Sequence, residues 1–176
     1  KMLLIIAIFS VITALSSAQN VNARCYLYNA VAGGVGNQLM GTLDLVQTGQ
    51  QLRINGTITG AMPAGLHGFH IHEKGDIGNG CLNAGGHYNP SGKNHGAPTD
   101  TDRHVGDLGN VQADTSGNIN VDITDTVASL TGPISVMGRG IVLHQNPDDL
   151  GKGNSPDSKT TGNAGPRIGC GVIGYA

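Results

Sequence analysis

Histidine is the residue type in this chain with the clearest chemical meaning. All seven histidines lie between positions 67 and 144 of a chain of 176 residues. A lone histidine is usually a solvated surface residue or a core residue whose hydrogen bonds are satisfied. Seven within one stretch, accompanied by a suitably spaced aspartate, favour metal binding instead.

Two of these histidines alternate along an expected strand. Side chains two positions apart on a strand point to the same face, so His70 and His72 lie together while their apolar neighbours enter the core. His144 ends an apolar run and can supply a third imidazole from a neighbouring strand. A site built of imidazole nitrogens suits copper or zinc.

A second group combines three histidines with one aspartate. Its spacing is His-x7-His-x8-His-x2-Asp, and its members are His87, His95, His104 and Asp107. Three imidazoles and a carboxylate make a closed tetrahedral zinc site. Because no ligand position stays open, such a zinc is structural and fixes the loop that carries it.

The elements that must position these residues have the pattern of short strands. After residue 20, apolar and polar residues alternate with a period of two, and no segment shows helical periodicity. Strands are expected at 21–28, 39–46, 52–58, 66–72, 106–113, 119–124, 139–144 and 168–174. Turns are expected at Gly33-Gly34 with Gly36-Asn37, at Thr48-Gly49 and at 114–118. This pattern favours an antiparallel sandwich or barrel.

Two long connections interrupt the strands. Residues 73–105 and 145–167 are polar and rich in Gly, Asn, Asp and Pro. Long connections in a compact domain are usually functional or disordered. The first one carries three histidines, so we expect metal to order it.

The start of the chain has the composition of a secretion signal. Residues 2–15 are almost wholly apolar, which is too short for a comfortable bilayer span of about 20 residues. Lys1 precedes this run, and the small residues 16–18 follow it. We expect a signal peptide at 1–18 and a mature domain at 19–176. A signal anchor or a buried helix is the alternative.

Composition restricts the partners and suggests two modifications. The net charge is −2 and there is no basic run, so neither nucleic acid nor, after signal cleavage, a membrane is an expected partner. Three cysteines in a secreted chain allow one disulfide and one leftover thiol. Asn55-Gly56-Thr57 is a glycosylation sequon, for which the alternative is that it stays unused.

Five segments resemble the copper,zinc superoxide dismutase family. They are GFHIHEKGD (68–76), AGGHYNP (84–90), DRHVGDLGNV (102–111), DDLGKG (148–153) and GNAGPRIGCGVIG (162–174). The resemblance implies an all-β fold, an eight-stranded antiparallel Greek-key β-barrel of immunoglobulin-like sandwich architecture with two long functional loops. It also implies a secreted, homodimeric antioxidant enzyme that dismutes superoxide to dioxygen and hydrogen peroxide through a Cu(II)/Cu(I) cycle, with one copper and one zinc per subunit.

The same resemblance assigns a role to each candidate site residue. Copper would be held by His70, His72, His87 and His144, and zinc by His87, His95, His104 and Asp107. His87 would bridge the metals and act with Arg167 in catalysis, while Asp148 would link ligands of the two metals. Cys81 and Cys170 would form the disulfide. Cys25, on an apolar strand face, would be a buried free thiol, and His67 would bond to backbone.

Two departures from the family pattern concern charge. Lys152 and Lys159 lie in the loop where the family keeps lysines that steer superoxide, but Lys159 is displaced by one position. Lys74 stands where many family members have an apolar residue in the dimer interface, so we expect a weaker or differently packed homodimer.

Three other functions compete with the enzyme. An extracellular copper- or zinc-binding protein without turnover would not need Arg167 or four copper ligands. A dismutase-like domain of a copper chaperone predicts an added metal-binding domain and often lacks copper ligands. An adhesion or structural domain has no use for clustered histidines.

Overall fold

The computed structural model describes residues 20–176, so the expected signal peptide lies outside the described residues. The strands are β1 (Val21–Val31), β2 (Gly34–Thr48), β3 (Gln51–Ile58), β4 (Gly65–His72), β5 (Asp107–Ala113), β6 (Ile119–Asp125), β7 (Gly140–His144) and β8 (Arg167–Tyr175). Two single-turn helices, η1 (Leu82–Ala84) and α1 (Ser158–Thr161), lie in the long connections. In this part of the chain no helix has the length and apolar character needed to cross a membrane.

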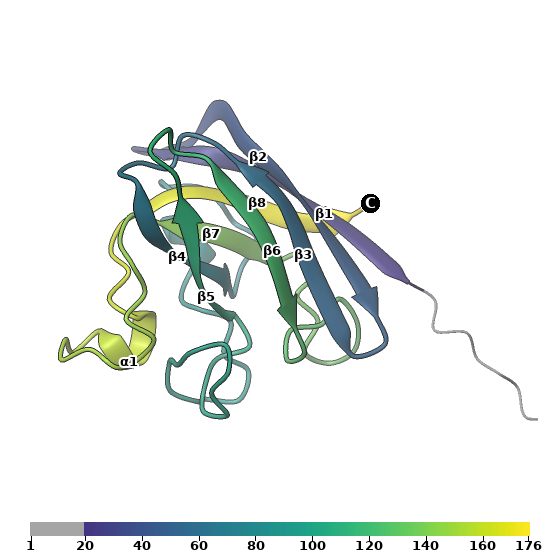
Figure 1. Ribbon diagram of the computed structural model, residues 1–176. Helices are drawn as coiled ribbons and strands as arrows, with labels where there is room; N and C mark the ends of the chain where they lie inside the picture. Colours follow the sequence, from purple (N-terminus) through teal and green to yellow (C-terminus); the bar gives the residue numbers. More distant parts are fainter. Residues whose placement is uncertain (1–19) are drawn as a thin grey trace, which may run out of the picture.

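The strands close into one antiparallel barrel (Figure 1). Their order around the barrel is β1-β2-β3-β6-β5-β4-β7-β8. The chain therefore leaves sequential order twice, where β3 pairs with β6 and β4 pairs with β7. These crossovers are the Greek-key pattern, so the expected eight-stranded Greek-key barrel is confirmed.

The core follows from the period-two alternation of the strands. On β3, Leu52, Ile54 and Ile58 are fully buried, whereas Arg53 between them faces solvent. On β1, Cys25 is fully buried, and burial raises the pKa of its thiol to about 12. The expected buried free thiol is thereby confirmed.

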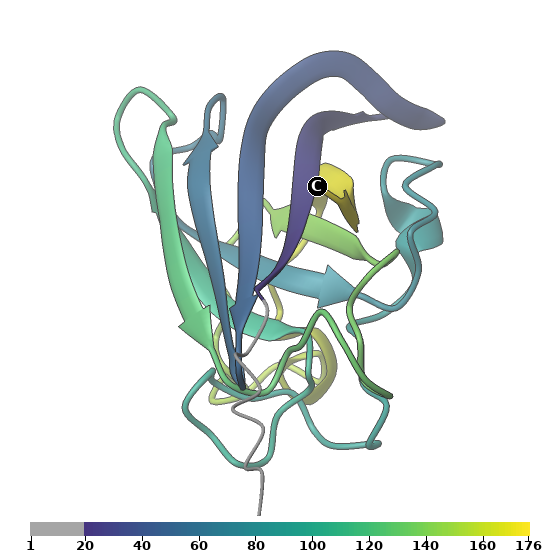
Figure 2. The same cartoon turned by 90° about the vertical axis from the view of Figure 1, so that its right-hand side faces the viewer.

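The first hairpin differs from the expectation. The strand expected at 39–46 begins at Gly34, so Gly36-Asn37 lies inside β2 rather than in a turn. The turn itself lies before Gly34, and two register shifts in β1 accommodate the longer pairing. The side-chain oxygen of Asn29 accepts a hydrogen bond from the backbone of Gln38, which stabilises the irregular region. The two strands curve together at the top of Figure 2.

The long connections pack against each other at one end of the barrel (Figure 1). The backbone N–H of His95 donates to the carbonyl of Lys159, which joins the two connections directly. A disulfide between Cys81 and Cys170 ties the first connection to β8 across 89 residues of sequence. Closing a loop of this length stabilises the fold by roughly 4–5 kcal/mol in the chain-entropy account. The barrel and the disulfide thus anchor loops that have few strands or helices of their own.

The alternation predicts that substitutions at adjacent residues of β3 differ sharply in their effect on the free energy of unfolding. Ile54→Ala should lower the free energy of unfolding by about 2–5 kcal/mol, because the side chain is fully buried. Arg53→Ala is the matched control and should change the free energy of unfolding much less, since its ion pair with Asp122 is exposed. Urea unfolding measures both, and equal losses would contradict the assigned faces of β3.

Candidate metal centre

Four histidines converge between the barrel and the first long connection. β4 carries His70 and His72, β7 ends in His144, and His87 reaches the group from the connection. A backbone bridge between His72 and His87 holds the connection against β4. All four are buried, and one nitrogen of each lies within 4.8 Å of those of the others. The structure thus brings together the four residues expected to bind copper.

Hydrogen bonds on the far side of the rings decide which nitrogens face inward. Nδ1 of His72 lies 2.8 Å from the carbonyl oxygen of Gly85, and Nδ1 of His144 lies 3.1 Å from that of Gly165. A carbonyl can only accept, so both Nδ1 atoms carry the proton and both Nε2 atoms offer lone pairs. Nε2 of His70 bonds to a carboxylate, which leaves its Nδ1 facing the group.

The inward nitrogens lack protein partners. Among residues 20–176, His70 Nδ1 and His87 Nε2 are buried without any hydrogen bond. Buried polar atoms are normally paired, and leaving one unpaired costs about 1–3 kcal/mol. The Nε2 atoms of His72 and His144 lie 3.3 Å apart and also point into this space. A metal ion that accepts these lone pairs would compensate each of them.

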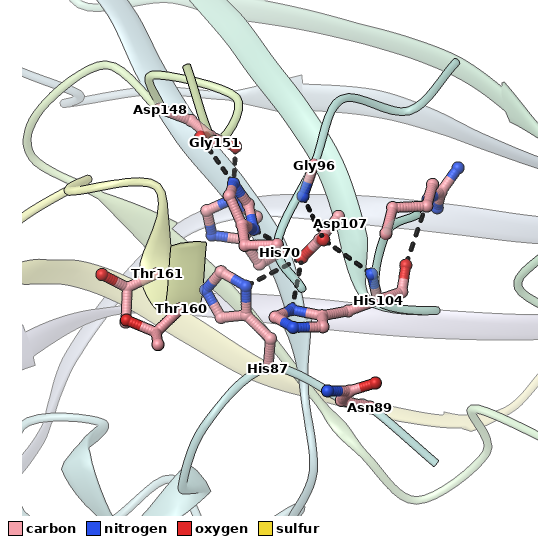
Figure 3. A network of polar contacts seen from close by, with 12 residues as sticks. His70, His87, Asn89, Gly96, His104, Asp107, Asp148, Gly151, Thr160 and Thr161 are labelled. Atoms are coloured by element: carbon pink, nitrogen blue, oxygen red, sulfur yellow. Dashed lines mark hydrogen bonds and ion pairs between the residues drawn. The ribbon is translucent and has the colours of Figure 1, made fainter. Parts of the chain in front are cut away.

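The second group converges on a single carboxylate oxygen (Figure 3). Oδ1 of Asp107 lies 2.8 Å from Nδ1 of His87, 2.9 Å from Nδ1 of His95 and 3.1 Å from Nδ1 of His104. Its Oδ2 accepts hydrogen bonds from the backbone N–H groups of Gly96 and His104 at 3.1 and 2.8 Å. Three ring nitrogens and one oriented carboxylate are thus collected at one point, as a tetrahedral metal site requires.

His87 belongs to both groups. Its Nδ1 faces Asp107 and its Nε2 faces the four-histidine group. The two groups are therefore joined through one imidazole ring, whose ring centroid lies 4.0 Å from that of His70. A movement of this ring that alters its position in one group therefore also alters its position in the other.

Asp148 connects the groups a second time. Its Oδ2 lies 2.9 Å from Nε2 of His70, and its Oδ1 lies 2.8 Å from Nε2 of His95. The carboxylate thus accepts the outer N–H of one ring from each group and orients both. A Cβ at Gly162 would overlap this carboxylate, and Gly162 also has a positive φ, so only glycine fits there.

Sequence reasoning missed three residues that support these groups. Asn110 brackets Asp148 with two backbone contacts: its amide donates to the Asp148 carbonyl and its side-chain oxygen accepts from the Asp148 N–H, at 2.8 and 2.7 Å. Arg103, beside His104, forms a buried ion pair with Asp125 at 2.7 Å. The sequence signal that could have found them is a polar residue inside an otherwise apolar strand or next to an expected metal ligand. Alternation alone does not say what such residues contact.

His67 joins neither group. Its Nδ1 lies 2.8 Å from the carbonyl of His144 and its Nε2 lies 2.8 Å from that of Pro63. The expected role in bonding to backbone is therefore present in the structure.

Burial separates the protonation behaviour of the two groups. Desolvation, followed by repulsion from neighbouring rings, lowers the pKa of His70 and His72 well below the ordinary range. Desolvation lowers the pKa of His144 to about 4. The four-histidine group is therefore free of extra protons at neutral pH and ready to bind a cation.

Protonation differs in the Asp107 group because one of its rings, that of His95, has two carboxylate partners. Burial of the His95 ring opposes its charge, but hydrogen bonds to Asp107 and Asp148 outweigh that cost and raise its pKa to about 9. Burial works against the Asp107 charge too, yet the three surrounding rings hold the pKa of this carboxyl far below its usual range. Without metal, this group holds a proton at neutral pH.

Arg167 lies at the open side of the four-histidine group. It lines a cavity of about 330 Å³ together with His72, His87 and His144. Its guanidinium donates to the carbonyls of Cys81 and Gly85, each at 2.6 Å, so the disulfide-anchored segment sets its position. Burial lowers the pKa of Arg167, but a guanidinium stays charged at neutral pH.

The two loop lysines do not line this cavity. Lys152 and Lys159 line a different hollow beside His95, together with Asp100 and Asp102. The cavity of Arg167 instead contains Asp157. The structure therefore agrees with the departure from the family pattern noted for these lysines, because neither lines the cavity that contains Arg167. Lys159 lies in the single-turn helix α1, and its side chain is exposed.

Comparison with known proteins agrees with this site. A family model described as copper/zinc superoxide dismutase matches residues 39–173. The chain is 51% identical over 174 residues to an extracellular superoxide dismutase (Cu-Zn) of Caenorhabditis elegans, covering 99% of this chain and 77% of that protein. It is 56% identical over 154 residues to one of Haemonchus contortus, covering 88% of this chain and 84% of that protein. The chain belongs to the copper/zinc superoxide dismutase family.

Both metals of a copper/zinc superoxide dismutase fit the donor atoms present. Four imidazole nitrogens, from rings of which three line an open cavity, suit a redox-active copper ion. Three imidazole nitrogens and a carboxylate, buried and closed, suit a structural zinc ion. A third combination of His70, His95 and Asp148 is already satisfied by hydrogen bonds and serves to link the other two.

The raised pKa of His95 predicts a pH-dependent zinc affinity in this dismutase. Zinc must displace the proton that His95 holds below about pH 9, so affinity should rise with pH. The expected slope is about tenfold per pH unit between roughly pH 7 and 8.5, since one proton is exchanged. Competition between the metal-free protein and a chromophoric chelator measures this slope. A flat profile would show that His95 carries no proton.

Proposed function

We propose that this protein is an extracellular enzyme that dismutes superoxide to dioxygen and hydrogen peroxide. The observation that carries the proposal is the pair of buried ligand groups that share His87, one closed and the other open beside Arg167. A protein that merely stores metal needs neither an open position nor a fixed cation next to it. The relatives named extracellular superoxide dismutase support the same activity and the same location.

Each group is assigned one metal in this proposal. His70 Nδ1 and the Nε2 atoms of His72, His87 and His144, which are the nitrogens left without carbonyl or carboxylate partners, would hold copper. The Nδ1 atoms of His87, His95 and His104 and Asp107 Oδ1 would hold zinc. Asp148 orients one ligand of each metal and is a positioning residue.

Copper supplies the one-electron chemistry, by which one superoxide is oxidised to dioxygen and a second is reduced to peroxide. The protein supplies the proton path. Because Nδ1 of His87 is held in the Asp107 group, its Nε2 is the ring atom that can take up a proton from solvent through the open cavity whenever that atom is not bound to copper. From there the proton passes to the reduced dioxygen species, and a further proton from solvent completes hydrogen peroxide.

Arg167 attracts and orients the anion. Two short hydrogen bonds to backbone carbonyls leave the guanidinium little freedom, so its charge stays beside the cavity. Since the loop lysines line another hollow, Arg167 is the cation among the residues that line this cavity in the described part of the chain. Fixed charge at a low-dielectric opening raises the rate of anion association.

The activity is tested by inhibition of superoxide-dependent cytochrome c reduction. Residues 19–176 loaded with copper and zinc should inhibit strongly, and His70→Ala combined with His144→Ala should abolish inhibition by removing two copper ligands. Metal content is measured in both samples. Failure of the wild type to inhibit, with both metals bound, would reassign the protein to metal binding without turnover.

Substitution of Arg167 tests whether its charge attracts superoxide. Arg167→Ala should lower kcat/KM by about tenfold or more and weaken its dependence on ionic strength, because a steering charge is lost. Arg167→Lys keeps the charge and should lose less. Arg53→Ala, an exposed arginine on the outside of the barrel, is the matched control. Similar rates for the Arg167→Ala and Arg53→Ala variants would remove Arg167 from the reaction.

The proposal includes secretion after cleavage behind Ala18, with 19–176 as the mature enzyme. The apolar run 2–15 and the names of the extracellular relatives support it. Sequencing the N-terminus of the secreted protein tests the cleavage position, and a protein that begins at residue 1 contradicts it.

A homodimer through β1 and β8 completes the proposal. Tyr26 and Val172 expose 48 and 36% of their surface on the outer face of these two paired strands, an apolar surface that a second copy can cover. Gly75, next to Lys74, packs beside Val172, so Lys74 stands at the margin of this surface. Its side chain is 63% exposed and can stay hydrated when the copies meet.

Sedimentation velocity at micromolar protein tests this dimer. The wild type should sediment as a dimer, and Val172→Glu should shift it to monomer because a charge would be buried in the interface. Val127→Glu, at an exposed valine outside β1 and β8, is the control and should leave the dimer intact. A monomeric wild type would contradict the proposal.

A further inference from the structure

The tip of the β1–β2 hairpin, residues 29–38, packs against the disulfide. Ala30 and Val35 lie opposite each other in this hairpin tip, and both pack against the apolar cluster that contains Cys81 and Cys170. This cluster is separate from the main core of the barrel, and both cysteines in it are fully buried. The hairpin tip therefore supplies part of the small core in which the disulfide lies.

A backbone hydrogen bond joins the hairpin tip to the first long connection. The N–H of Gly80 donates to the carbonyl of Gly34 at 2.8 Å. The next residue is Cys81, whose carbonyl accepts the hydrogen bond from Nη1 of Arg167 at 2.6 Å. Figure 2 shows the hairpin tip beside the segment that contains η1. The contact with the hairpin tip and a carbonyl that holds Arg167 therefore lie on adjacent residues.

The backbone at Gly80 and Cys81 needs support from its surroundings. Both residues have a left-handed conformation, with φ angles of 61 and 68°. Glycine adopts this conformation readily, whereas a residue with a Cβ keeps it only where other contacts hold it. The Gly34 carbonyl on one side and the disulfide on the other are such contacts, and they direct the Cys81 carbonyl to Arg167.

The hairpin tip is also fixed to β8. Asn29 of β1 lies opposite Gly169 of β8, the strand that begins at Arg167. The side-chain oxygen of Asn29 accepts a hydrogen bond from the N–H of Gln38 across the hairpin at 3.2 Å. A Cβ at Gly36 would overlap this side chain, so only glycine leaves room for it. The hairpin tip thus contacts both segments that the disulfide joins, β8 and the first long connection.

We propose that the hairpin tip positions Arg167 for the reaction and that Val35 is the side chain through which it acts. The proposal rests on the proposed function, in which Arg167 attracts and orients superoxide. Val35 does not line the cavity beside Arg167, so it is a positioning residue and not a catalytic one. It keeps the hairpin tip on the disulfide cluster, and the hairpin tip keeps Gly80 and Cys81 in place.

The first test observes the Arg167 guanidinium directly by NMR of its nitrogens. The protein carries both metals, with copper reduced to Cu(I) so that neither metal is paramagnetic. Nη1 and Nη2 each donate to a carbonyl, which prevents rotation, so the wild type should give separate signals for them. Val35→Asn places a polar amide against the apolar cluster, which should release the hairpin tip and merge the two signals. Arg167→Lys lacks these signals and thereby assigns them.

Three matched variants control for general damage to the hairpin. Val35→Ile keeps an apolar side chain and should keep the signals separate. Leu39→Asn changes an exposed residue of β2 that does not pack against the disulfide cluster, and it should also keep them separate. Val35→Ala is a milder change that should bring the signals closer together, and it serves if Val35→Asn does not fold. Metal content and an intact disulfide are confirmed for every variant.

The second test measures the rate of superoxide dismutation. Val35→Asn keeps the guanidinium charge but not its fixed direction, so kcat/KM should fall by about threefold or more. The dependence of kcat/KM on ionic strength should remain, whereas Arg167→Ala weakens it. A variant that is merely less stable, with both metals bound, would lose neither the rate nor the separate signals.

The outcomes distinguish this inference from the proposed function. Separate signals in Val35→Asn and Val35→Ala overturn the inference and leave the dismutase untouched. Merged signals with an unchanged rate also overturn it, because the position of Arg167 would then not matter to the reaction. Merged signals in a protein whose wild type binds both metals but does not dismute superoxide overturn the proposed function and leave the link between Val35 and Arg167 standing.

Discussion

The sharing of one imidazole between two ligand groups is the constraint on which the site depends. Nδ1 of His87 faces the Asp107 group and its Nε2 faces the four-histidine group. Its ring therefore cannot rotate or shift without disturbing one of the two ligand groups. The connection that carries it must therefore be held from both sides. The backbone bridge to His72 on β4 and the convergence of rings on Asp107 supply that restraint. A rigid barrel is needed behind it, because ligand positions must hold to within a fraction of an ångström.

The long connections are ordered by polar contacts and covalent links rather than by a core of their own. Asp148 joins a ring from each group, Asn110 holds Asp148, and the Arg103–Asp125 pair fixes the segment beside His104. The disulfide anchors the carbonyls that hold Arg167. Such networks are costly when incomplete, since removal of one partner of a buried ion pair costs about 3–5 kcal/mol. The unpaired ring nitrogens are the part of the network that metal completes.

The electrostatic environments of the two ligand groups differ, and this difference suits them to different metals. The same ring type has a pKa of about 4 at His144 and about 9 at His95, because one is buried among imidazoles and the other between two carboxylates. The group without carboxylate ligands stays proton-free and open to the cavity, which suits a metal that must exchange electrons with a small anion. The group with the carboxylate is closed and carries charge of its own, which suits a structural cation.

The sequence by itself determined the strands and the histidine-rich ligand groups, because alternation and histidine spacing are local properties, whereas the pairing of Cys81 with Cys170 came from the resemblance to the dismutase family. The sequence could not determine which hollow Lys152 and Lys159 line, because that depends on how the second long connection packs against the first. Gly36-Asn37 proved to lie within β2, because pairing with β1 outweighed local turn preference. The roles of Asn110, Arg103 and Asp125 were also decided only by tertiary structure, because their partners lie 22 to 38 residues away.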